Sequence, residues 1–85
     1  MPTTDEQARL VRTIAKSIYP ALCGQAPEVQ GAVLADLLSL FIAGHHPALR
    51  EDILKMHIER VRELIGPSEA EIFANRDKPE GWDQQ

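Results

Sequence analysis

The sequence predicts an all-α protein, a small antiparallel bundle of three main helices with a short fourth helix. Apolar residues recur at spacings of three and four, and no stretch shows the alternation typical of a half-buried strand. Capping residues and Gly or Pro stops separate these apolar segments, and the short connections between them favour antiparallel packing. We therefore predict a helical domain over residues 1–75 and an extended or disordered C-terminal tail over residues 76–85.

The first predicted helix begins at residues 3–4, where Thr3 and Glu6 have the spacing of a capping box. Its apolar residues share one half of the helical wheel, which is typical of an amphipathic surface helix; they are Ala8, Leu10, Val11, Ile14, Ala15 and Ile18. Pro20 disfavours helical geometry in the residue before it, so the helix should end or kink there. One further turn is expected before Gly24 stops the helix.

The second predicted helix runs from Pro27, a residue suited to a first turn, to about Ala43. Gly44 is expected to cap it in the left-handed conformation. Large apolar residues cover well over half of its circumference; they are Val29, Val33, Leu34, Leu37, Leu38, Leu40, Phe41 and Ile42. A helix that is apolar nearly all round is expected to be central and buried.

The third predicted helix begins at Pro47 and ends at Ile65, because Gly66 and Pro67 follow as a stop signal. Its apolar residues span an arc of roughly 200° at 3.6 residues per turn. A short fourth helix should follow, starting at a second capping-box pattern formed by Ser68 and Glu71.

The apolar arcs of the second and third helices are wider than a small monomer needs. A helix on the surface of one small domain requires a stripe of roughly 100°. The chain has 85 residues and one cysteine, so it has no internal disulfide to compensate for a small core. We therefore predict a homodimer, or binding to a protein partner.

Charge and hydropathy disfavour several other classes of partner. The formal net charge of −4 disfavours nucleic-acid binding, because proteins that bind nucleic acids normally carry a basic excess. The longest apolar-rich stretch, residues 29–44, is shorter than the ~20 residues of a membrane span and carries Asp36, so no membrane association is expected. The single cysteine and the acidic, polar N-terminal residues favour a cytoplasmic location.

Four residues are candidates for ligand binding: His45, His46, Arg50 and His57. His46 and His57 lie ~16 Å apart along one helix, which is too far for a shared metal ion. No metal ion and no cofactor is therefore predicted. The structural interpretation, which we favour, has His46 capping the helix that Pro47 begins.

His57 and Arg50 fall on the apolar arc of the third helix, where a polar group must be paired. In the structural interpretation His57 bonds a backbone carbonyl, and Arg50 pairs with Asp36 or with a C-terminal carbonyl of the second helix. In the alternative interpretation, these two residues and the His45–His46 loop bind a small ligand or a metal between subunits.

No nucleophile elbow, phosphate-binding loop or other catalytic motif is present in the sequence. No catalytic residue is assigned, and an enzyme is disfavoured. Trp82 is the large apolar residue of the polar tail, and we expect it to fold back onto its own helices rather than to anchor a partner. The predicted function is a non-enzymatic helical interaction module, an accessory or regulatory subunit that acts as a homodimer.

Overall fold

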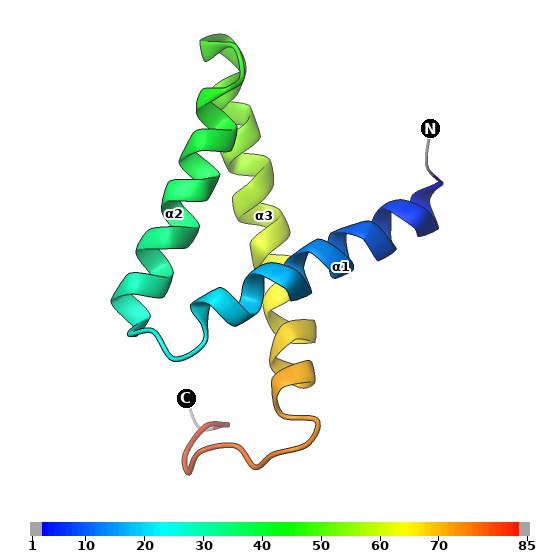
Figure 1. Ribbon diagram of the computed structural model, residues 1–85, viewed down its shortest axis with the longest axis vertical. Coiled ribbons are helices and arrows are strands. Elements are labelled where there is room, and N and C mark those ends of the chain that lie inside the picture. Colours follow the sequence, from blue (N-terminus) through cyan, green and yellow to red (C-terminus); the bar gives the residue numbers. More distant parts are fainter. Residues whose placement is uncertain (1–2, 84–85) are drawn as a thin grey trace. The chain divides into compact units, whose positions relative to one another are not determined.

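The computed structural model describes residues 3–83, which form three helices (Figure 1): α1 (Thr4–Leu22), α2 (Pro27–Ala43) and α3 (Pro47–Ile72). The described range contains no strand, which confirms the predicted all-α class. It divides into two compact units, one ending at Ser39 and one beginning at Leu40. The predicted boundary at residue 75 stays a prediction, and residues 1–2 and 84–85 of the predicted domain and tail lie outside the described range.

The capping box predicted for α1 is present. The Glu6 backbone N–H donates to the Thr3 hydroxyl over 3.1 Å, and the Thr3 N–H donates to the Glu6 carboxylate over 3.1 Å. The helix continues through Pro20 for the single further turn that the sequence predicted, to Leu22. Its N-terminus is therefore fixed by side chains.

A β-turn connects α1 to α2. Cys23 has φ −62° and ψ 137°, and Gly24 has φ +80°. The Gln25 N–H donates to the Leu22 carbonyl over 3.2 Å, which completes a turn of type II geometry. The Gln30 side-chain amide donates to the same carbonyl over 2.7 Å. Gly24 is thus confirmed as the stop of α1, because this turn needs a positive φ at its third residue.

The bounds of α2 match the prediction, but its expected C-terminal cap does not. Among the described glycines, positive φ occurs at Gly24 and Gly81 and not at Gly44. The Gly44 N–H instead donates to the Leu40 carbonyl over 3.1 Å, as a continuing α-helix would. A left-handed residue is not needed here, because the side chains of His45 and Arg50 bond the backbone carbonyls of Phe41 and Ala43 at the end of the helix.

The predicted break between a third and a fourth helix is wrong. Helix α3 continues through Gly66 and Pro67 to Ile72, so Ser68 lies within a helix rather than at the start of one. Pro67 has no N–H, which deprives the Glu63 carbonyl of its usual helical donor.

The described part of the tail contains no helix after α3. Trp82 folds back, and its indole N–H donates to the Glu69 carboxylate over 2.6 Å. The rings of Trp82 and Phe73 lie 5.1 Å apart in an edge-to-face arrangement. This confirms the expectation that the tryptophan contacts its own chain.

Residues 3–83 bury no apolar core. No side chain within residues 3–83 is fully buried, and this includes all of α2, which the sequence predicted to be central. The second unit has half-buried apolar residues in the last turns of α2, in the first half of α3 and at the end of α3; they are Ile42, Ile53, Leu54 and Phe73. Burial of α2 would require further helices to cover it.

Candidate functional site

The turn between α2 and α3 contains two of the four predicted ligand-binding residues, His45 and His46, and a third, Arg50, reaches this turn from the start of α3. The Arg50 Nη2 donates to the Ala43 carbonyl over 2.8 Å, and its Nε donates to the His45 carbonyl over 3.1 Å. Of the two structural partners predicted for Arg50, the C-terminal carbonyl of α2 is confirmed and Asp36 is not its partner. Two nitrogen atoms of the Arg50 guanidinium thus donate to backbone carbonyl oxygens.

Side-chain groups and backbone N–H groups of the turn donate hydrogen bonds to all of the last four backbone carbonyls of α2. The His45 Nδ1 lies 2.9 Å from the Phe41 carbonyl and must donate to it, because a carbonyl can only accept. The His45 backbone N–H donates to the Ile42 carbonyl over 3.0 Å. With the bonds to Leu40 and Ala43 already described, each of the last four carbonyls of α2 has a donor. Arg50 also places a positive charge at the negative end of the helix dipole.

His46 caps the start of α3. Its Nδ1 accepts a hydrogen bond from the Ala48 backbone N–H over 3.1 Å, and Pro47 occupies the first turn. Proline suits this place because the first N–H groups of a helix have no helical acceptor. The predicted capping role of His46 is confirmed.

His57 is half-buried, and its ring packs against the aromatic ring of Phe41. Its Nδ1 is 2.8 Å from the Ile53 carbonyl, which confirms the predicted bond to a backbone carbonyl and assigns the proton to Nδ1. Phe41 packs edge-to-face against two imidazoles, with ring centroids 4.8 Å from His45 and 5.2 Å from His57. These three rings join the last turn of α2 to α3.

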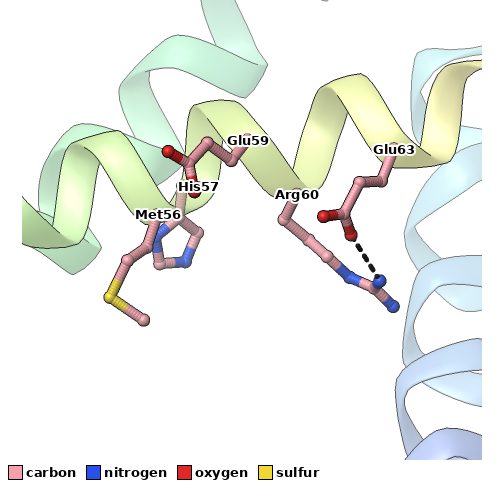
Figure 2. A pocket seen from close by; sticks show the side chains of 5 residues that line it. All are labelled: Met56, His57, Glu59, Arg60 and Glu63. Atoms are coloured by element: carbon pink, nitrogen blue, oxygen red, sulfur yellow. Dashed lines mark hydrogen bonds and ion pairs between the residues drawn. The ribbon is translucent and has the colours of Figure 1, made fainter.

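A shallow pocket lies beside His57 on α3 (Figure 2). Its lining residues all project from one stretch of this helix; they are Met56, His57, Glu59, Arg60 and Glu63. Arg60 and Glu63 form an ion pair of 3.2 Å, with both side chains about two-thirds exposed. Arg50 does not line this pocket, so the structure does not bring Arg50 and His57 together around one cavity.

The described residues offer little for metal chemistry. Within residues 3–83, no three side chains of His, Cys, Asp or Glu gather closely enough to hold a metal ion. Cys23 is exposed. None of the described helices is both long and apolar enough to cross a membrane.

The largest unexplained feature is the apolar surface of α2. Leu37 is 48% exposed and Leu40 is 65% exposed, although both are large aliphatic side chains. We call the exposed set the α2 apolar surface; its members are Val29, Val33, Leu34, Leu37, Leu40 and Phe41. Helix α3 adds exposed residues of the same kind, namely Leu49, Met56, Ile58, Val61, Leu64 and Ile65. Exposed apolar area on this scale is typical of a surface that contacts another protein.

Two polar residues that organise the structure were missed by sequence reasoning, Gln30 and Glu69. Gln30 bonds a group eight residues away in the chain and Glu69 bonds one thirteen residues away, so no local spacing indicates either pairing.

The chain matches no known protein family, no curated protein sequence and no solved structure. Its function is therefore inferred from its own residues.

Proposed function

We propose that this chain is a non-enzymatic helical interaction module that acts as a homodimer and serves as an accessory or regulatory subunit. The observation that carries the proposal is the exposure of the α2 apolar surface in a chain with no buried side chain in residues 3–83. Fully burying one large apolar side chain stabilises a protein by about 1.5–3 kcal/mol. An interface over α2 and α3 would supply the burial that the single chain lacks.

The composition of α2 favours a second copy of the chain as the covering partner. Between Glu28 and Ala43 the helix carries one charged residue, Asp36. A helix so poor in charge resembles a domain core more than a transient contact surface, which is typical of obligate homodimers. Twofold symmetry then lets the same apolar surface serve both subunits.

The polar candidates support a structural rather than a catalytic role. Arg50, His45 and His46 each bond backbone groups at the ends of α2 and α3. Each of these side chains holds this turn through at least one of its nitrogen atoms, which supports a structural role. The turn therefore supports the interface by fixing the end of α2.

The test is the mass of the protein in solution. Sedimentation equilibrium at micromolar concentration should give twice the 9.5 kDa of the chain. Leu37→Asp should give monomeric or unfolded protein, because an unpaired charge buried in an apolar interface costs several kcal/mol. Thr13→Asp is the matched control, because Thr13 is exposed on the polar half of α1. The Thr13→Asp protein should remain dimeric.

A protein that stays folded and monomeric on dilution to nanomolar concentration would disprove the homodimer. A Leu37→Asp variant with the parent's mass and the parent's stability would disprove the assignment of the interface to α2. Circular dichroism of the same samples reports whether the helices persist.

A further inference from the structure

The continuity of α3 across Gly66 and Pro67 is not favoured by its own sequence. Glycine and proline are the two weakest helix formers, and here they lie next to each other in the C-terminal part of a 26-residue helix. Pro67 also leaves the Glu63 carbonyl without a helical donor. Residues 68–72 can form a short helix of their own from the Ser68–Glu71 pattern, so local preference explains a separate helix but not one that is continuous with the rest of α3.

The apolar contacts available to these last turns are few. Between Pro67 and the end of the helix, Ile72 is the one large apolar residue, and it is 47% exposed. Phe73 follows directly as the C-terminal cap and is half-buried. Two tail residues contact Phe73, because the Arg76 guanidinium lies 5.6 Å from the centre of its ring and Trp82 packs against its edge.

Trp82 makes two different contacts with this end of α3. Its indole N–H donates to the Glu69 carboxylate over 2.6 Å, and its ring meets Phe73 edge-to-face at 5.1 Å. The same tryptophan shares a surface hollow with Ile65, which precedes Pro67, and with Ile72, which follows it. Both direct contacts of Trp82 therefore lie beyond the proline, and the hollow that it lines extends back to Ile65 before the proline.

The tail has internal bonds that keep Trp82 in reach. Gly81 has φ +79°, and the Trp82 backbone N–H donates to the Pro79 carbonyl over 3.1 Å. Lys78 and Asp83 form an ion pair of 3.2 Å. Trp82 itself stays 48% exposed, so its attachment depends on a few contacts and not on enclosure in a core.

We propose that Trp82 is a releasable latch that keeps α3 helical across Gly66 and Pro67. With the latch closed, the last turns of α3 persist and Phe73 is covered. With the latch open, α3 ends near Ile65, and Ile72 and Phe73 lose their cover. The tail thereby controls both the length of α3 and the access to its terminal apolar residues, whether the chain is a monomer or a dimer.

Amide hydrogen exchange measured by NMR on the full chain tests the latch. In Trp82→Ala, the amides of residues 68–72 should exchange about tenfold faster, the effect of losing one hydrogen bond to a charged group. The amides of residues 51–62 should keep the parent's rates. Glu69→Ala should act like Trp82→Ala, while Glu69→Gln keeps an acceptor oxygen and should exchange more slowly than Glu69→Ala.

A matched control and a rescue sharpen the test. Glu71→Ala removes a carboxylate from the same two turns, and the structure gives this side chain no hydrogen bond within residues 3–83, so exchange should stay at the parent's rate. Pro67→Ala restores the missing N–H and a strong helix former. Added to Trp82→Ala, it should return residues 68–72 toward the parent's protection.

Three results would overturn the latch. One is unchanged exchange at residues 68–72 in Trp82→Ala. Another is an equal response to Glu69→Ala and Glu71→Ala. The third is tryptophan fluorescence that shifts on dilution in step with a fall in the sedimentation mass, because an intramolecular contact does not depend on concentration. Trp82 is the single tryptophan of the chain, so its emission reports this contact alone.

Discussion

The two interhelical turns of the chain are built in different ways. The turn from α1 to α2 depends on the backbone, because Gly24 adopts φ +80° and the Gln25 N–H closes onto the Leu22 carbonyl. The turn from α2 to α3 depends on side chains, with Arg50 and His45 bonded to the carbonyls that end α2. The first turn therefore needs a particular backbone conformation, whereas the second needs particular hydrogen-bond donors.

This difference separates two roles that glycine can have after a helix. Gly24 occupies a region of backbone conformation that other residues rarely adopt. Gly44 occupies a similar place in the sequence but lacks a positive φ, since side chains have taken over the capping. Substitutions at these two glycines and at Arg50 can test the distinction directly.

The largest effect is expected for Arg50→Ala. It removes both bonds from the guanidinium to the Ala43 and His45 carbonyls and a favourable charge at the end of α2. We expect a loss of about 1.5–2 kcal/mol in the free energy of unfolding, measured by urea denaturation at fixed protein concentration. Arg62→Ala is the control on the same helix and should change stability little. Equal losses in the two variants would show that the second turn does not depend on its side chains.

Gly24→Ala should have the next largest effect. A Cβ at this position meets no atom within 4 Å, so the penalty comes from the left-handed backbone and not from a clash. We expect a loss of ~1–2 kcal/mol. Gly31→Ala is the control, because Gly31 lies inside α2 with open space around it and alanine should stabilise the helix there. A Gly24→Ala protein as stable as the parent would remove the backbone argument for the first turn.

Gly44→Ala should have the smallest effect. A Cβ here would lie 3.5 Å from the Phe41 carbonyl oxygen and 3.7 Å from that of Leu40, which is ordinary contact. We expect the free energy of unfolding to stay within about 0.5 kcal/mol of the parent. Thermal denaturation monitored by circular dichroism, run beside Gly24→Ala, provides the comparison. A loss matching that of Gly24→Ala would mean that the two turns do not differ as described.

Features that depend on neighbours in sequence were predictable. The Thr3 cap, the bounds of α2, the His46 cap and the bond from Arg50 to the end of α2 each involve residues no more than seven positions apart. The short range of these contacts explains why spacing rules found them.

Features that depend on distant residues were not predictable in the same way. Gly66 and Pro67 are a strong local stop signal, yet Trp82 contacts α3 from thirteen residues beyond Glu69 and the helix continues. The alternative site interpretation grouped Arg50 with His57 from their shared helical face. In the structure each bonds a different backbone carbonyl, as the favoured structural interpretation predicted.

The local character of the second turn has a kinetic consequence. All of its bonds join residues within a short stretch of chain, from Leu40 to Arg50. Closing a short loop costs little conformational entropy, and contacts of low sequence separation are typical of fast folding steps. We therefore expect this turn to form early, and to give the rest of α3 a fixed starting point from which its helix can extend.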